Sequence, residues 1–301
     1  MQDLRPLAAL CGECGAAYAE NVPLEKYTTF RIGGNCDAMA ELPDAEAAQK
    51  IVRYLKETGI PFRLIGKGSN LLVRDEGYHG VVLRLTGSLE EVSPAENGRL
   101  CCGAGAPLKS LCLAALKASL TGLEFAYGIP GTVGGAVYMN AGAYDGDISQ
   151  VLTEVTYLDE AGTLCTAQKD ALELSYRHSI FMGRNCQILS AAFTLQQGEP
   201  EQIRSRMQDL LHRRQEKQPL EYPSAGSTFK RPEGSYASLL IDQCGLKGYR
   251  VGGAQVSTKH AGFVVNRGDA TFADVMAVCR HVQETVQTQT GYRLDLEPEI
   301  L

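Results

Sequence analysis

The sequence predicts a protein of the α/β class (or, more broadly, α+β), with two lobes and a third α/β domain. Strand and helix patterns alternate along its 301 residues, with no internal repeat or low-complexity linker between them. The clearest helix follows Asp44, a capping residue type, and places Ala48, Ile51 and Leu55 on one face before Gly59 ends it. Two glycine-rich loops also follow predicted secondary structure closely. We therefore expect tightly packed parts that hold a ligand on loops.

The remaining elements are predicted from periodicity and from turn residues. In the two lobes we expect a helix over 2–20, an entry loop over 27–34, a helix that starts at Pro107 and ends at Gly122, and strands over 37–42, 61–65, 71–73, 80–85, 90–103, 151–158, 163–168 and 186–195. In the third part we expect helices over 199–217, 236–245 and 271–290 and a strand over 261–265.

Composition excludes several classes of function. The chain has 35 acidic and 29 basic residues, a net charge of −6, so nucleic acid is not an expected partner. An anionic substrate would need locally placed positive charge. No apolar run approaches the length of a bilayer span, and the N-terminus lacks a signal-peptide pattern. We expect a cytoplasmic monomer that binds small molecules and no membrane.

The ten cysteines fit reduced thiols better than a disulfide scaffold, because the chain is long for such a scaffold. Cys11-Gly-Glu-Cys14 is a CxxC pair, but a zinc site needs a second pair or histidines at ligand spacing. Cys101 and Cys102 are adjacent and do not supply that spacing. We expect no metal site and assign no role to the Cys11/Cys14 pair.

Residues 127–144 hold five glycines around a Pro130-Gly131 turn. Gly134-Gly135-Ala136 offers backbone amides with little side chain in front of them, which suits phosphate oxygens, although an ordinary glycine-rich loop explains this stretch equally well. A second loop, Gly66-Lys-Gly-Ser-Asn70, lies between two predicted strands. Neither common nucleotide motif is present, because Leu71 replaces the third glycine of the dinucleotide fingerprint and Leu108 replaces the glycine before the P-loop lysine.

Three motifs together resemble one family. Tyr27-Thr-Thr-Phe-Arg-Ile-Gly-Gly34, the loop at 66–70 and Gly128-Ile-Pro-Gly-Thr-Val-Gly-Gly-Ala136 are similar to the UDP-N-acetylenolpyruvoylglucosamine reductases, FAD enzymes of bacterial peptidoglycan precursor synthesis. The resemblance implies a two-lobed FAD-binding domain of the PCMH and vanillyl-alcohol-oxidase type, with lobes at 1–88 and 89–198. It also implies a substrate-binding domain at 199–301 whose last residues return to the flavin.

The resemblance further implies FAD and NADPH as cofactors; the preference for NADPH over NADH rests on the resemblance alone. It assigns contacts to FAD to thirteen residues of the two glycine loops. These are Gly66, Lys67, Gly68, Ser69, Asn70, Leu71, Gly131, Thr132, Gly134, Gly135, Ala136, Asn140 and Gly142.

Arg177 lies in Ser175-Tyr-Arg-His-Ser179, a short segment between strands. Such an arginine is most often a surface residue, but loops also carry binding groups. The resemblance implies that Arg177 contacts the substrate carboxylate, which its planar fork of donors matches in pairs. It implies that the neighbouring Tyr176 contacts the substrate as well.

Ser227 lies in a loop over 222–232 that two prolines and a glycine shape. From the residues alone, this loop is equally a structural turn with capping serines. The resemblance implies that Ser227 gives a proton to the substrate and that Lys217 faces the sugar-nucleotide diphosphate. Arg231 indicates the shorter type of the family, which lacks an extra loop covering the substrate.

Glu299 follows the proline of Leu294-Asp-Leu-Glu-Pro-Glu299, and the resemblance makes it the catalytic glutamate, with Glu297 as the rival. The sequence stops at Leu301, two residues later, so either the end is truncated or Glu299 is held by less structure than usual. Gln255, Ser257 and His260 follow the family pattern for the substrate site, although a buried structural histidine fits His260 as well.

The implied reaction is the reduction of UDP-N-acetylglucosamine enolpyruvate to UDP-N-acetylmuramate. Arg177 and Glu299 would stabilise the enolate formed by hydride addition, with Glu299 protonated or hydrogen-bonded, and Ser227 would protonate it. One alternative is another FAD-dependent oxidoreductase of this fold. Those often tether the flavin through histidine or cysteine, which both glycine loops lack. A nucleotide-binding module without catalysis is the other alternative, and it would not need Arg177, Ser227 and Glu299 together.

Overall fold

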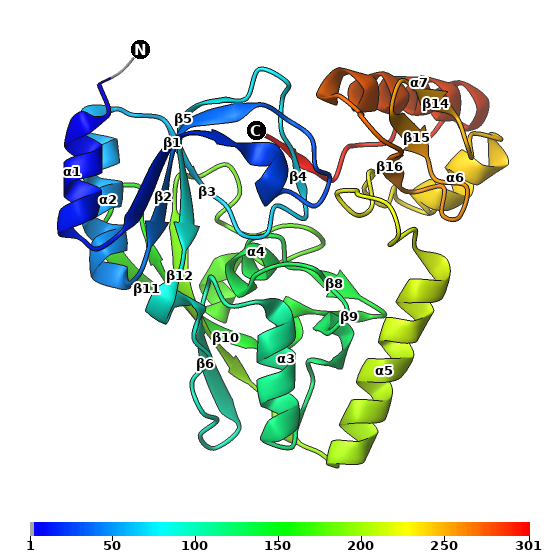
Figure 1. The fold of residues 1–301 in the computed structure, drawn as a ribbon. Helices are drawn as coiled ribbons and strands as arrows, with labels where there is room; N and C mark the ends of the chain where they lie inside the picture. Colours follow the sequence, from blue (N-terminus) through cyan, green and yellow to red (C-terminus); the bar gives the residue numbers. More distant parts are fainter. Residues whose placement is uncertain (1–2) are drawn as a thin grey trace. The chain divides into compact units, whose positions relative to one another are not determined.

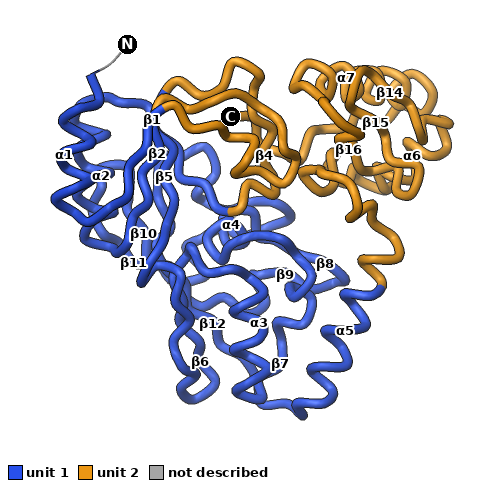
Figure 2. The backbone as a smooth tube through the Cα atoms, in the orientation of Figure 1, with its two compact units in different colours: residues 1–20, 38–66, 80–212 blue, residues 21–37, 67–79, 213–301 orange. Residues whose placement is uncertain are grey.

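The computed structural model describes residues 3–301, which form two compact units, each drawn in its own colour in Figure 2. The first unit consists of residues up to Glu20, Ala38–Gly66 and Gly80–His212. The second consists of Asn21–Asp37, Lys67–His79 and Arg213–Leu301. Each unit has its own hydrophobic core, so each has an independent source of stability. The domain boundaries expected at 88 and 198 stay predictions.

The first unit contains one four-stranded sheet and most of a second one, with helices packed beside them (Figure 1). One sheet has the order β1-β2-β5-β3, from Ala17–Pro23, Asn35–Leu42, Tyr78–Leu85 and Phe62–Leu64. The other has the order β11-β10-β12-β6, from Leu164–Gln168, Leu152–Leu158, Gln187–Thr194 and Arg99–Gly103. Two short pairs complete the strands of this unit: β7 (Leu120–Thr121) with β13 (Gln196–Gln197), and β8 (Gly142–Ala143) with β9 (Gly146–Asp147).

The helices of the first unit are α1 (Arg5–Glu13), α2 (Ala45–Thr58), α3 (Leu108–Lys117) and α4 (Val133–Tyr138). Helix α5 (Pro200–Lys217) begins in the first unit and ends in the second. The predicted signals of α2 are confirmed. The Asp44 carboxylate accepts a hydrogen bond from the Ala47 amide at 2.8 Å, and Gly59 ends the helix with a φ of 68°.

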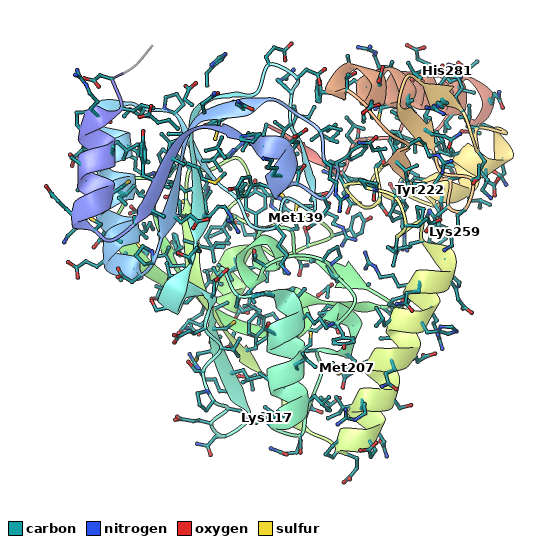
Figure 3. All side chains as sticks on the ribbon, in the orientation of Figure 1. Lys117, Met139, Met207, Tyr222, Lys259 and His281 are labelled. Carbon is teal, nitrogen blue, oxygen red and sulfur yellow. The ribbon has the colours of Figure 1, made fainter. Side chains whose placement is uncertain are left out.

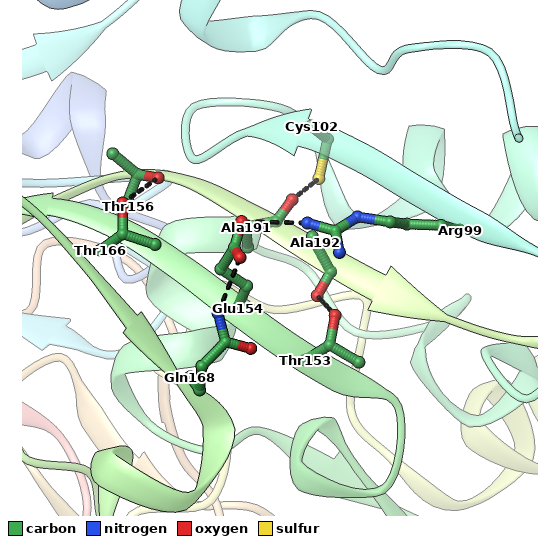
Figure 4. Close-up of polar contacts among 9 residues, drawn as sticks. All are labelled: Arg99, Cys102, Thr153, Glu154, Thr156, Thr166, Gln168, Ala191 and Ala192. Atoms are coloured by element: carbon green, nitrogen blue, oxygen red, sulfur yellow. Dashed lines mark hydrogen bonds and ion pairs between the residues drawn. The ribbon is translucent and has the colours of Figure 1, made fainter.

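Antiparallel pairing holds the sheet β11-β10-β12-β6, and polar side chains cross between its strands (Figure 4). The Glu154 carboxylate on β10 accepts hydrogen bonds from Arg99 on β6, at 2.9 Å, and from Gln168 on β11, at 2.8 Å. The Thr153 hydroxyl donates to the Ala192 carbonyl at 3.0 Å. Side-chain contacts of this kind between strands stabilise the sheet.

The second unit has a small sheet, β14-β15-β16, from Arg250–Val251, Ala254–Val256 and Val264–Asn266. Helices α6 (Ala237–Gln243) and α7 (Phe272–Thr290) pack against each other, and α7 packs on this sheet (Figure 1). Thr271 and Asp274 form a capping box at the start of α7. A separate parallel pair joins β4 (Leu71–Leu72) to β17 (Glu299–Ile300).

Four sequence predictions are wrong in detail. The helix expected over 2–20, which begins outside the described residues, ends at Glu13, because Gly15 turns the chain with a φ of 66° and a strand follows. Helix α3 ends at Lys117, before the expected Gly122, because Ser119 takes a φ of 59°. The strand expected over 90–103 covers only Arg99–Gly103, and the one expected over 261–265 is Val264–Asn266.

The described residues contain no helix that is both long and apolar enough to cross a membrane. Cys11 of the CxxC pair is fully buried, and burial raises the pKa of its thiol to about 11. This thiol is therefore protonated and unreactive at neutral pH.

Candidate functional site

The first four residues of the loop Gly66–Leu71, which joins β3 to β4, keep their backbone donors unused. Within residues 3–301, no group accepts a hydrogen bond from the amides of Gly66, Lys67, Gly68 or Ser69. Side chains at the glycines are also excluded: an added Cβ at Gly66 would collide with the Thr132 hydroxyl, and one at Gly68, where φ is 60°, with the Tyr27 carbonyl oxygen. Consecutive amides without a partner are costly unless a ligand or water accepts their hydrogen bonds. The loop therefore fits the diphosphate of a dinucleotide cofactor.

The second glycine stretch is built differently. Residues 133–138 form the short helix α4, capped by the Thr132 hydroxyl, which accepts from the Gly135 amide at 3.3 Å. The Gly134 amide donates to the Ala104 carbonyl at 2.7 Å, and the Ala136 amide donates to the Thr132 carbonyl at 2.9 Å. The interpretation of Gly134-Gly135-Ala136 as a free run of amides is therefore wrong, because all three are used inside the protein.

Glycine is nevertheless required at position 134, because an added Cβ would lie 2.9 Å from the Cβ of Ala104. The Gly131 carbonyl accepts from the Leu108 amide at 3.0 Å, which ties the stretch to the start of α3. Met139, labelled in Figure 3, ends α4. Contacts of this stretch to a cofactor stay a prediction.

Arg177 lies at a two-residue turn in the first unit. Ser175 and His178 exchange backbone hydrogen bonds of 3.2 and 3.1 Å, which leaves Tyr176 and Arg177 at the tip. Arg177 is half-buried and has a φ of 53°, a conformation that glycine or asparagine ordinarily takes. Its guanidinium lies 5.0 Å from the ring centre of Tyr176, which is 54% exposed. This conformation costs free energy in a non-glycine residue, so surrounding contacts must hold it.

Ser227 lies in the second unit, where its loop runs antiparallel to the C-terminal segment. The Glu297 amide donates to the Thr228 carbonyl at 3.0 Å, and the Lys230 amide donates to the Asp295 carbonyl at 2.9 Å. These two backbone bonds fix the segment that follows Ser227 against the segment that precedes Glu299. Ser227 itself is half-buried.

Glu299 is held from the other side by the loop at 66–71. Its amide donates to the Asn70 carbonyl at 2.9 Å, and the Asn70 side chain donates to the Glu297 carbonyl at 3.2 Å. The Leu301 amide then donates to the Leu72 carbonyl at 2.9 Å. Glu299 therefore lies on a paired strand, β17.

The entry loop joins the same arrangement. The Thr29 amide donates to the Gly68 carbonyl at 3.3 Å, and the Thr29 hydroxyl donates to the Ser224 carbonyl at 2.6 Å. The structure thus brings together, in one unit, residues 67–71 of the glycine loop, the Ser227 loop and Glu299. The glycine loop is more than 150 positions from the other two segments along the chain, so their meeting was expected from the family resemblance alone.

Thr228 is a residue of this site that the sequence analysis missed. It is only 3% exposed, its hydroxyl accepts from the Val264 amide at 2.9 Å, and its amide donates to the Gly262 carbonyl at 2.8 Å. It therefore anchors the residue next to Ser227 to β16. Nothing local in the sequence marks it, because its partners lie 34 or more positions away.

The three residues predicted to line the substrate site all serve local structure. The Gln255 side chain donates to the Gly248 carbonyl at 3.0 Å, and the buried Ser257 hydroxyl accepts from the His260 amide at 3.2 Å. The His260 ring accepts from the Gly262 amide at 3.2 Å, and burial lowers the pKa of His260 below its ordinary value of 6.5. These bonds support the structural reading of His260; substrate contacts of all three stay predictions.

Lys217 is exposed on the last turn of α5. Nearby, Lys259 (labelled in Figure 3) donates to the Gln215 carbonyl at 2.8 Å. This bond ties the end of α5 to the segment that carries Ser257 and His260. Lys217 itself lies at the surface, where an anionic ligand can reach it.

Comparison with known proteins assigns both parts of the chain. A family model described as an FAD binding domain matches residues 36–168. A model described as the C-terminal domain of UDP-N-acetylenolpyruvoylglucosamine reductase matches residues 218–301. An FAD-binding domain followed by a substrate-binding domain defines a flavin-dependent oxidoreductase, and the predicted fold class is confirmed.

Full-length relatives are more specific. The UDP-N-acetylenolpyruvoylglucosamine reductase of Agathobacter rectalis is 49% identical, with 93% of this chain and 92% of that protein covered. The same enzyme of Clostridium novyi is 46% identical over 93% and 91%. The crystal structure of the reductase from Thermus caldophilus superposes with a TM-score of 0.81 at 34% identity, covering 95% of this chain and 98% of that one. The chain belongs to the UDP-N-acetylenolpyruvoylglucosamine reductase family.

Proposed function

We propose that this chain uses NADPH and FAD to reduce UDP-N-acetylglucosamine enolpyruvate to UDP-N-acetylmuramate, a step of peptidoglycan precursor synthesis in the cytoplasm. One observation carries the assignment of the site beyond family membership. Part of a loop with unused amides, the Ser227 loop and the strand of Glu299 are hydrogen-bonded into one arrangement in the second unit. A cofactor diphosphate and two reactive side chains thus share one supporting framework.

The amides of Gly66 to Ser69 hold the diphosphate of FAD in this proposal. They supply fixed donors without a charge of their own, and glycine at 66 and 68 keeps side chains out of the way. The flavin supplies the hydride chemistry when bound. The protein contributes position, charge and the proton.

Arg177 pairs with the substrate carboxylate, and its charge persists throughout the reaction. Lys217 faces the diphosphate of the substrate. Ser227 donates the proton to the carbon next to the carboxylate, and Glu299 stabilises the enolate that precedes this step by a hydrogen bond. Ser227 and Glu299 lie on segments joined by backbone hydrogen bonds, so the backbone at one residue cannot move independently of the backbone at the other.

The test is an anaerobic spectrum of the purified protein. The flavin absorbance should bleach with NADPH and return only with UDP-N-acetylglucosamine enolpyruvate. Return with a different acceptor would keep the fold and overturn the substrate, in favour of another oxidoreductase of this fold. A colourless protein that FAD does not reconstitute would overturn the proposal altogether.

A further inference from the structure

The turn that carries Arg177 is closed by one pair of backbone bonds between Ser175 and His178. Because Arg177 has a φ of 53°, the turn is strained at the residue that the reaction needs. Strain of this kind persists only where surrounding contacts impose it.

Asn140 holds it from outside. Its side-chain amide donates to the Ser175 carbonyl at 2.9 Å, and its side-chain oxygen accepts from the Ser149 amide at 2.9 Å. Asn140 is 3% exposed, so neither bond exchanges readily with water. The Ser175 carbonyl that it binds is the same oxygen that accepts from the His178 amide and closes the turn.

Two further contacts join the same segments. The buried Ser179 hydroxyl donates to the Tyr138 carbonyl at 2.7 Å, and the Arg177 guanidinium donates to the Gly142 carbonyl at 3.3 Å. Tyr138, Asn140 and Gly142 therefore each contact one residue of the segment 175–179. Among these residues, Asn140 binds the backbone of the turn with its side chain. That side chain donates to Ser175 and accepts from Ser149.

We infer that Asn140 is a positioning residue for the reductase reaction. It fixes the backbone from which Arg177 projects, and so the alignment of the guanidinium with the substrate carboxylate. The inference rests on the role proposed for Arg177. The predicted contact of Asn140 to FAD would have to come from its backbone, since its side chain is already engaged on both sides.

A double-mutant cycle tests this role by the rate at which substrate reoxidises the reduced flavin in a single turnover. The variants are N140A, R177A and the N140A/R177A double variant, each checked for FAD content. N140A should slow reoxidation by about 100-fold, because a displaced catalytic group loses alignment. In the R177A variant, adding N140A should slow reoxidation by less than about twofold. Asn140 acts through the Arg177 side chain, which R177A has already removed. Reduction by NADPH should be unchanged throughout.

Two further variants protect the result against misfolding. N140D keeps the acceptor for the Ser149 amide but loses the donor to Ser175, so it should reproduce the slow reoxidation in a folded protein. T153V removes a hydrogen bond of similar length on β10, away from the turn, and should leave the rate unchanged.

Equal effects of N140A in both backgrounds would overturn the positioning role, as would loss of FAD from N140A or N140D. A wild-type rate in R177A would instead overturn the proposed role of Arg177. Absence of reoxidation in the unmodified protein would overturn the proposed function.

Discussion

Arg177 in the first unit and Ser227 with Glu299 in the second are held by different means. The Arg177 turn depends on side chains, those of Asn140 and Ser179, and it contains a strained residue. The Ser227 and Glu299 segments depend mainly on backbone bonds to each other and to the loop at 67–72, with added side-chain bonds from Asn70 and Thr29. We therefore expect single side-chain substitutions to disturb the first arrangement more than the second.

The difference agrees with the chemistry proposed for each group. An arginine that forms two parallel hydrogen bonds to a carboxylate needs a precise orientation. A strained turn held by neighbouring side chains can set that orientation. A proton donor and a hydrogen-bonding carboxylate need a fixed spacing, which a paired backbone supplies. At each site, variants can separate a loss of reaction rate from a loss of folding stability.

The largest effect is expected from S227A, which removes the proposed proton donor and leaves the backbone frame intact. Flavin reoxidation by substrate should slow by about 10²–10⁴-fold, while reduction by NADPH stays unchanged. Stopped-flow absorbance measures both half-reactions. S224A is the matched control, since Ser224 lies in the same loop and its hydroxyl accepts a long bond of 3.4 Å from the Gly226 amide. An equal loss in S224A would mean that the loop, not the proton, matters.

At the Arg177 turn, the loss of the guanidinium can be separated from the relief of backbone strain. R177G removes the guanidinium and should slow reoxidation by about 10²–10³-fold. Because glycine accepts the left-handed conformation, R177G should be more stable to unfolding than R177A by about 1 kcal/mol. Urea denaturation of the two variants measures this difference. Equal stabilities would show that the turn is not strained at Arg177.

Thr228 is the exception within the backbone-held site, because its buried hydroxyl is the acceptor for the Val264 amide. T228V keeps the side-chain shape but leaves that amide without a partner, which should lower the free energy of unfolding by about 1–3 kcal/mol. T228S retains the hydroxyl and should recover most of the loss. If both variants unfold at the same urea concentration, the hydrogen bond contributes little and packing alone accounts for the site.

The sequence predicted most where signals are local. Asp44 and Gly59 mark both ends of α2, and the structure confirms them. Helix α4 was missed because a six-residue segment with two glycines has poor intrinsic propensity and depends on a bond to Ala104, thirty positions away. Propensity cannot register such distant support.

The same limit applies to the candidate site. Arg177, Ser227 and Glu299 came from motifs of a known family, and their assigned roles stay predictions. The contacts that hold them are not local: Asn140 meets Ser175 across 35 positions, and Thr228 meets Val264 across 36. Single-sequence patterns describe neighbours in a helix or strand, so they cannot identify supports of this kind.

The smallest effect concerns His260, whose ring accepts a bond from Gly262 beside the Ser227 segment. Burial lowers the pKa of His260 below 6.5, so between that value and the lowered one the unfolded chain binds a proton that the folded chain does not. Stability should therefore be complete above about pH 6.5 and fall as the pH drops below it, by at most about 1.4 kcal/mol per pH unit. H260Q can retain the acceptor for Gly262 without titrating, so its Tm should fall less between about pH 7 and about pH 5. Parallel Tm curves for the two proteins would show that His260 does not link this site to pH.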